Sequence, residues 1–533
     1  MLMNKVSTEE LKRRITAPEE LALIDVREAG SFSRAHLLFA VSVPFSRLEL
    51  GFAVLVPRLG TPIVLCDDCT GVAERAAERL AQFGYTRLEI LDGGIGAWQD
   101  AGYEIFSGVN VPSKAFGEFV EQEYETPRLP ATQVKAKIDA GEKVVILDSR
   151  PMAEFNNMSI PGGSCCPGAE LVYRVSDAVE DPDTLVVVNC AGRTRSIIGC
   201  QSLINAGIPN PVVALKDGTM GWHLAGFGLD HGQTRFAPPV SESGLKRAQA
   251  MAASVSQRFG VRKITPSELS MFQDEAGERS LFLLDVRSAE EYEAGHLSGS
   301  ISAPGGQLVQ ATDEFVGVRN ARLVLIDDTG VRAVMTASWL IQMGWESVYV
   351  LEDGLQHGDL ETGKGKRHVL GLDGLNVPMI SPLKLHSLLT GDGARVFDLS
   401  NSLEYRAGHI SGARRAARLG FSAALEGLPV GSQVVVTSAD GVLAQLTVNE
   451  WTPVAGTTVS VLDGGLNAWR TAGYALVEGE DSEAGELPED VWYRPYDRTA
   501  GIEQAMQAYL SWEVALVEQI ERDGTTRFLQ FES

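Results

Sequence analysis

The sequence predicts an α/β protein made of four tandem units, each a mostly parallel sheet flanked by helices, followed by a C-terminal helical tail. Short apolar runs, such as residues 281–284, alternate with longer amphipathic stretches, such as residues 334–343. This alternation is typical of parallel sheets covered by helices. The same pattern returns four times along the chain. Each copy spans on the order of 100 residues, the usual size of a single domain.

Each copy begins with an aspartate that follows an apolar run, and fixed steps lead from it to two later positions. Asp25, Asp148 and Asp285 each stand two residues before an arginine, and Asp398 begins a weaker fourth copy. A step of 42 residues (40 in the fourth copy) leads to Asp67, Cys190, Asp327 and Ser438. A further step of 27 or 28 residues leads to Gly94, Gly218, Gly354 and Gly465. Four residues after this glycine stand Trp98, Trp222 and Trp469, with Gly358 in the third copy. These constant steps indicate aligned copies of one domain.

We expect domains at residues 1–110, 125–235, 260–365 and 375–480, and a tail at residues 481–533. Helices are predicted in the connections, around residues 114–123 and 242–259. The tail should hold one more helix, because Ala505, Tyr509, Trp512, Leu516 and Ile520 lie near one helical face. We expect this helix to pack on the body or on a dimer partner, with a lid over a site as the alternative.

Charge and composition exclude several classes of protein. The 533 residues carry a net charge of −24, so the basic surface of a nucleic-acid binder is missing. No apolar stretch approaches the ~20 residues needed to span a bilayer, and residues 1–10 lack the apolar core of a secretory signal. Six cysteines are too few for a disulfide framework. We therefore expect a cytoplasmic protein without nucleic-acid or membrane partners.

The second copy carries the strongest chemical signal, a six-residue loop from Cys190 to Arg195 between an apolar strand (185–189) and a helix (197–206). A strand, a tight loop and a helix N-terminus turn several backbone N–H groups toward one point. A thiolate there is favoured by the helix end and by two loop arginines, which predicts a nucleophile with a depressed pKa. The residues expected to surround its anion are Ala191, Gly192, Arg193, Thr194, Arg195 and Ser196.

These features together resemble the rhodanese domain of sulfurtransferases. The resemblance rests on the aspartate-x-arginine, the Gly295-His296 and Gly408-His409 segments, the cysteine loop and the glycine–tryptophan ending, and it covers nearly all residues before 480. It implies that Cys190 accepts sulfane sulfur as a persulfide, without cofactor or metal. The donor would be a small anion, thiosulfate or a mercapto-acid, and the acceptor a thiol, cyanide or a protein. In two-domain relatives the active loop faces the partner domain, so the first unit should wall the Cys190 site.

Loop length favours sulfur transfer over phosphate chemistry. Rhodanese-like sulfurtransferases typically have six residues in this loop, and related phosphatases have seven. A shorter loop curls more tightly, which suits one sulfur atom rather than a larger tetrahedral oxyanion. A phosphatase or arsenate reductase is therefore the weaker alternative, and a non-catalytic scaffold or sulfur-carrier binding protein is the stronger one. The other copies are expected to be structural or regulatory. Asp67 and Asp327 have no thiol to accept sulfur, and Ser438 lacks a basic loop neighbour.

The remaining cysteines and the repeated histidines give weaker signals. Cys66 and Cys69 supply only two of the four ligands of a structural zinc, so no metal site is expected. A sulfur relay through Cys66, Cys69, Cys165 or Cys166 is left open, as is a homodimer. Cys200 should face the core. The histidines of the repeat should be buried and hydrogen-bonded; they are His36, His296 and His409.

Overall fold

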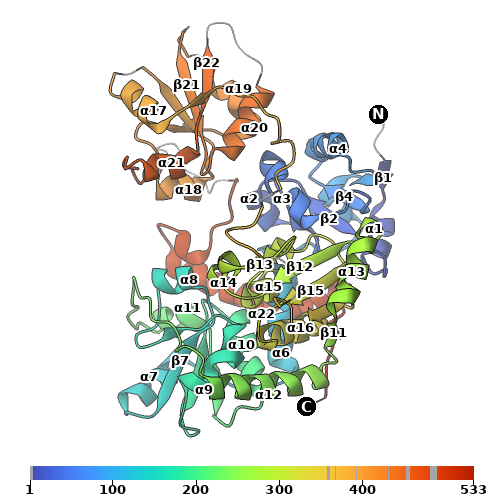
Figure 1. Ribbon diagram of the computed structural model, residues 1–533, viewed down its shortest axis with the longest axis vertical. Coiled ribbons are helices and arrows are strands. Elements are labelled where there is room, and N and C mark those ends of the chain that lie inside the picture. Colours follow the sequence, from blue (N-terminus) through green and yellow to red (C-terminus); the bar gives the residue numbers. More distant parts are fainter. Residues whose placement is uncertain are drawn as a thin grey trace.

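The computed structural model describes residues 4–356, 360–366, 368–391, 393–426, 428–429, 431–451, 457–479 and 489–532. Within these ranges lie four five-stranded sheets, one for each predicted copy (Figure 1). In every sheet the first strand of the copy is an edge strand beside the last strand, and neighbouring strands run parallel. The four-domain α/β architecture is confirmed. Gly358 of the repeat lies outside the described residues.

Domains 1 and 2 share one topology, and the strand that leads to the Asp67 or Cys190 position lies at the centre of each sheet. The strands of domain 1, in the order β1-β5-β4-β2-β3, are β1 (Asn4–Val6), β2 (Ala22–Asp25), β3 (Val41–Ser42), β4 (Ile63–Cys66) and β5 (Leu88–Leu91). Its helices are α1 (Thr8–Ile15), α2 (Ala29–Arg34), α3 (Leu48–Leu55), α4 (Val72–Gln82) and α5 (Gly94–Asp100). The strands of domain 2, in the order β6-β10-β9-β7-β8, are β6 (Arg128–Leu129), β7 (Val144–Asp148), β8 (Ser164–Cys165), β9 (Leu185–Asn189) and β10 (Val212–Leu215). Its helices are α7 (Ala131–Asp139), α8 (Met152–Asn157), α9 (Glu170–Ala178), α10 (Thr194–Asn205) and α11 (Gly218–Leu224).

Domains 3 and 4 repeat this arrangement, and domain 3 adds a short antiparallel pair. The strands of domain 3 are β11 (Arg262–Ile264), β12 (Leu281–Asp285), β14 (Ile301–Ser302), β15 (Arg322–Ile326) and β16 (Val348–Leu351), with the added pair β13 (His296–Leu297) and β17 (Leu360–Glu361). Its helices are α13 (Pro266–Asp274), α14 (Ala289–Ala294), α15 (Gly305–Gln310) and α16 (Val331–Gln342). The strands of domain 4 are β18 (Met379–Ile380), β19 (Arg395–Asp398), β20 (Arg414–Arg415), β21 (Gln433–Thr437) and β22 (Thr458–Leu462). Its helices are α17 (Pro382–Leu389), α18 (Ser402–Ala407), α19 (Phe421–Ala424), α20 (Val442–Glu450) and α21 (Gly465–Thr471).

Three helices lie outside the four domains: two connect successive domains and one belongs to the tail. The two predicted connecting helices are present as α6 (Val111–Glu123) and α12 (Glu242–Arg258), and the predicted tail helix is α22 (Ile502–Asp523). Helix α12 packs on α9 of domain 2 and on α16 of domain 3. Helix α22 packs on α6, where Leu516 and Ile520 join one buried apolar cluster with Val111 and Ala115.

The first three domains share a core, whereas domain 4 has its own. One cluster of buried apolar side chains runs through domains 1, 2 and 3. The two clusters of domain 4 consist of its own buried residues, and this domain lies at one end of the molecule (Figure 1). Arg418 of domain 4 donates to the buried Glu49 carboxylate of domain 1, at 2.6 and 2.9 Å. Among the described helices, none has the length and hydropathy of a membrane span.

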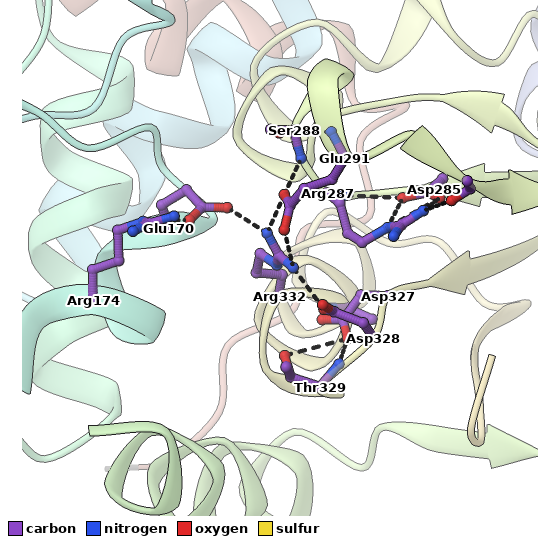
Figure 2. Close-up of polar contacts among 12 residues, drawn as sticks. Glu170, Arg174, Asp285, Arg287, Ser288, Glu291, Asp327, Asp328, Thr329 and Arg332 are labelled. Carbon is purple, nitrogen blue, oxygen red and sulfur yellow. Dashed lines mark hydrogen bonds and ion pairs between the residues drawn. The ribbon is translucent and has the colours of Figure 1, made fainter. Parts of the chain in front are cut away.

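A buried arginine ties domain 2 to domain 3. The Arg332 side chain is 0% exposed and donates to Glu170 of domain 2 (2.8 Å) and to Glu291 and Asp328 of domain 3 (2.7 and 2.6 Å; Figure 2). A charge removed from water is tolerated only when its partners are close and hydrogen-bonded. Arg332 therefore fixes the orientation of α9 of domain 2 against α16 of domain 3.

We predict that Arg332→Ala destabilises the contact between these domains by about 3 kcal/mol, because three carboxylates would lose their shared cation. Differential scanning calorimetry should show a lower midpoint for the transition that includes domains 2 and 3. The control is Lys135→Ala, which removes an exposed pair with Asp139 and should cost less than ~1 kcal/mol. Equal shifts in both variants would contradict the structural role of Arg332.

Candidate active site

The Cys190 loop lies at the carboxyl end of β9, the central strand of domain 2. The thiol is 2% exposed, and its Sγ lies 3.6 Å from the Ser196 hydroxyl. The Ser196 hydroxyl donates to the carbonyl of Arg193 at 2.7 Å. The predicted succession of strand, loop and helix is present, but α10 begins at Thr194 rather than at residue 197. Thr194 and Arg195 therefore belong to the first helical turn, which faces the thiol.

The repeated glycine marker has a local cause in this loop. Gly218 has a φ of +55°, and a Cβ at this position would lie 2.5 Å from the Cys190 carbonyl oxygen and 2.6 Å from that of Gly192. A side chain would therefore push the β10–α11 turn away from the reactive loop. Gly94 and Gly465 make the same close approach to the carbonyls of Asp67 and Ser438. The glycine step in the sequence thus reflects the packing of one turn against the loop in each of these copies.

The two loop arginines have different surroundings. Arg193 donates its Nε and Nη2 to both oxygens of Glu118 at 2.7 Å, and it also donates to Glu121 (2.6 Å) and Asp217 (3.0 Å). These three carboxylates come from α6 and from the turn before α11. Because they engage both ends of the guanidinium, the contacts we observe for this side chain fix the loop to its scaffold.

Arg195 lines the cavity in front of Cys190, as Arg193 does, but its partners differ. It donates through a fork to Glu154 of α8 (2.7 and 2.8 Å) and to the Gln307 side chain of domain 3 (3.1 Å). Its positive charge acts to lower the pKa of the Cys190 thiol. The forked contact to Glu154 holds the guanidinium in one orientation at the cavity wall.

The cavity in front of Cys190 has a volume of about 250 Å³ and three walls besides the loop. Helix α6 contributes Lys114, domain 3 contributes Gln307 and Glu314, and the tail contributes residues from two segments. The tail residues are Trp492, Arg494, Pro495, Tyr496, Tyr509 and Glu513. The first domain was expected to form this wall, but its sheet and helices contribute no lining residue. Asn110, the last residue within the expected bounds of that domain and just before α6, is its one contribution to this lining in the described structure. The expectation is therefore wrong for most of the wall, which the tail forms instead, with α22 packed on α6.

Burial dominates the acid–base behaviour of the Cys190 thiol. Removal from water raises the pKa of the Cys190 thiol, while Arg195 and the hydroxyl and N–H of Ser196 act in the opposite direction. The Glu513 carboxyl adds to the increase. The predicted depressed pKa is therefore wrong for this structure, because desolvation outweighs the helix end and the arginine.

In domains 1 and 3 the side chain at the position that matches Cys190 accepts hydrogen bonds from backbone N–H groups of its own loop. Asp67 accepts N–H groups of Cys69 and Val72 at 3.0 Å and of Ala73 at 3.2 Å. Asp327 accepts N–H groups of the three residues Thr329, Gly330 and Ala333. In domain 4 the Ser438 hydroxyl accepts the N–H of Ala444 at 3.4 Å. A carboxylate of the chain itself occupies the anion site in domains 1 and 3.

The other cysteines are unpaired and mostly buried. Cys66, Cys165, Cys166 and Cys200 are buried, Cys69 is exposed, and all are free thiols. Cys200 belongs to the core cluster of domains 1 to 3, as predicted. In the described part of the chain, no group of three or more histidine, cysteine or acidic residues is arranged to hold a metal ion.

The histidines of the repeat are structural, as predicted. His36, His296 and His409 are buried, and each ring nitrogen Nδ1 lies 2.8 to 2.9 Å from a backbone carbonyl. Each ring stacks on the aromatic side chain four residues earlier. Burial lowers the pKa of His36 to about 4, so this histidine stays neutral.

The sequence matches the rhodanese-like domain family four times, over residues 7–101, 130–225, 265–358 and 381–472. These matches cover more than half of the chain, so the protein belongs to the rhodanese-like family, with four tandem domains.

One solved structure is similar over the whole chain. This protein is a thiosulfate sulfurtransferase from Pseudomonas aeruginosa, with 48% identity, a TM-score of 0.93, and coverage of 99% of this chain and 100% of that one. The expectation of a rhodanese-type enzyme is confirmed at the level of its class.

Two curated relatives match over single domains. A transcriptional regulator of the HTH type from Mycobacterium tuberculosis is 34% identical over 94 residues, which cover 18% of this chain and 40% of the regulator. A tRNA uridine(34) hydroxylase from Erwinia tasmaniensis is 29% identical over 76 residues, 14% of this chain and 22% of the hydroxylase. The chain therefore spans less than half the length of either curated relative.

Several site residues were not found by sequence reasoning. Glu154 had a detectable signal, because Arg195 and Glu154 stand at the same repeat positions as Arg332 and Glu291, which are also paired. Lys114 and the tail residues stand outside the repeat, so no repeat spacing pointed to them, and Tyr509 was placed only on the face of the expected tail helix.

We predict that alkylation of Cys190 in the resting protein has its midpoint above pH ~8.5, the ordinary value for a cysteine. A raised pKa keeps the thiol protonated, and hence unreactive toward iodoacetamide, to higher pH. The measurement is the rate of Cys190 modification against pH, followed by peptide mass, with the urea-unfolded protein as the reference. A midpoint below that of the unfolded protein would contradict the dominance of burial.

Proposed function

We propose that the protein transfers sulfane sulfur from a small anionic donor, such as thiosulfate or a mercapto-acid, to a thiol, cyanide or protein acceptor. Cys190 would carry the sulfur as a persulfide. The observation that supports this most strongly is that, of the four equivalent loop positions, only Cys190 combines a thiol with a cavity lined by arginine. Similarity over the whole chain to a thiosulfate sulfurtransferase favours thiosulfate as the donor.

The proposed reaction has two steps, each of which balances in atoms and charge. The Cys190 thiolate attacks the outer sulfur of thiosulfate, a new sulfur–sulfur bond forms, and sulfite leaves with the electron pair of the broken donor bond. The acceptor then attacks the terminal persulfide sulfur, and the Cys190 thiolate is released. The persulfide anion would lie among the amides from Ala191 to Ser196, and Arg195 would bind the donor's anionic group. Arg193 would keep the loop in shape.

We also propose that the protein works in the cytoplasm. Six free cysteines and no disulfide suit a reducing compartment, which supports the cytoplasm. Sulfur relay by Cys165 or Cys166 is disfavoured in this proposal. Both thiols are buried away from the Cys190 cavity lining, and burial raises the pKa of each.

We predict that the protein gains the mass of one sulfur atom after incubation with thiosulfate, and that the gain lies on the Cys190 peptide. Cys190→Ser should show no gain and no thiocyanate formation from cyanide, because a hydroxyl does not accept sulfane sulfur. Cys69→Ser, which removes an exposed thiol, is the control and should behave as the unaltered protein does. Sulfur gain by Cys190→Ser would overturn the assignment, and the absence of any gain would favour the scaffold alternative.

We further predict that Arg195→Lys raises the KM for thiosulfate about tenfold, a loss of about 1.4 kcal/mol. Lysine cannot keep the fork to Glu154 while it also reaches Gln307, so its charge would no longer be held toward the donor. Arg13→Lys, a change of an exposed arginine on α1, is the matched control and should leave the KM unchanged. An unchanged KM in Arg195→Lys would remove this arginine from the donor site.

A further inference from the structure

Glu513 is a buried carboxyl group of the tail in the wall of the Cys190 cavity. The residue is 2% exposed and comes from α22. Its Oε1 accepts the hydroxyl of Tyr509 at 3.1 Å and that of Thr194 at 3.4 Å. Its Oε2 is buried and has no hydrogen-bond partner in the described structure. One oxygen is thus anchored while the other is unsatisfied, and a buried polar atom without a partner is costly unless a ligand supplies one.

The unsatisfied oxygen lies against the reactive loop. A Cβ added to Gly192 would lie 3.1 Å from Glu513 Oε2, so the glycine leaves room for the carboxyl group beside the loop. Gly192 stands two residues after the nucleophile, within the stretch whose amides would surround the transferred sulfur. Glu513 and Cys190 both line this cavity.

Charged and titratable groups surround Glu513, and besides those named next, Arg195, Arg494 and Tyr496 line the same cavity. Lys114 and Glu118 lie on α6, Arg193 on the loop and Tyr509 on the same helix. Lys114 also lies 5.5 to 5.9 Å from the ring centres of Trp492, Tyr509 and Trp512. Burial raises the pKa of Glu513 to about 7 against the opposing effects of Lys114, Tyr509 and Arg193. Both forms of this carboxyl group are therefore populated near neutral pH.

The two forms would act differently on an anionic donor. An ionised Glu513 would place a negative charge beside the site of a dianion, at low dielectric, where like charges repel strongly. A protonated Glu513 would be neutral, and its O–H would be a hydrogen-bond donor without an acceptor inside the protein. The oxygens of a sulfonate or carboxylate group are acceptors of the required kind.

We infer that Glu513 selects for the anionic donor: it binds the donor through its O–H when protonated and excludes the donor when ionised. This inference rests on the proposed sulfur transfer at Cys190. It makes the tail part of the donor site and assigns a ligand contact to a residue outside all four repeats. It also predicts a donor affinity that falls as pH rises through neutrality, independently of the ionisation of the nucleophile.

The test measures thiosulfate binding by calorimetry in the full chain carrying Cys190→Ser, which cannot react. Between pH 6 and pH 7.5 the Kd should rise about fourfold, since only the fraction with protonated Glu513 binds. Adding Glu513→Gln, which cannot ionise but still donates a hydrogen bond, should abolish this rise. Adding Glu518→Gln, a change of an exposed residue on the same helix, should leave the rise intact.

Two further variants keep the test decisive. Tyr509→Phe removes a hydrogen bond that lowers the pKa of Glu513, so it should shift the weakening of donor binding to higher pH even if Glu513→Gln fails to fold. Burial lowers the pKa of Lys114 to about 8, so Lys114 is the competing titrating group. If the rise persists in Glu513→Gln, or if it disappears only in Lys114→Met, the inference is overturned. Persulfide formation in the unaltered protein, measured separately by mass, tests the proposed function itself.

Discussion

Backbone N–H groups that converge at the carboxyl end of each central strand need a hydrogen-bond acceptor. Whether a domain has an open cavity in front of its loop depends on how it supplies that acceptor. Domains 1 and 3 supply it internally, through the carboxylates of Asp67 and Asp327. Domain 2 has the smaller Cys190 side chain, which leaves an open cavity in front of the loop. Domains 1 and 3 therefore fill this position with a carboxylate of the chain itself, whereas in domain 4 the Ser438 hydroxyl accepts the N–H of Ala444.

The same repeat position serves different purposes in domains 2 and 3. Arg195 and Arg332 each follow the loop's first residue by five positions, and each pairs with the glutamate that stands six residues after the first aspartate of its copy. In domain 3 the arginine also binds Glu170 of domain 2, and so joins two domains. In domain 2 the arginine reaches Gln307 of domain 3 but still faces the cavity. Arg332 thus adds an ion pair between domains 2 and 3, and domain 3 in turn supplies a hydrogen-bond partner for Arg195.

The repeat made much of the fold predictable from the sequence. The steps from Asp148 to Cys190 and on to Gly218 reflect contacts within one domain, where strand and loop lengths are fixed, so they located the four domains and the reactive loop. The walls of the cavity were not predictable in this way. Gln307 and Glu513 reach Cys190 through packing between distant segments, which leaves no periodic pattern. The pKa of Cys190 was misjudged because sequence neighbours reveal nearby charges but not the loss of water around the thiol.

The closure of the Cys190 cavity by α22 also bears on how the protein is made. During translation, domains form in order from the N-terminus, so the loop of domain 2 emerges from the ribosome long before the tail. Until Tyr509 and Glu513 have been synthesised and docked on α6, the reactive thiol lacks one wall of its pocket. Completion of the cavity therefore coincides with a late step of folding, and chains whose synthesis stops early carry the cysteine without the group that we infer selects for the donor.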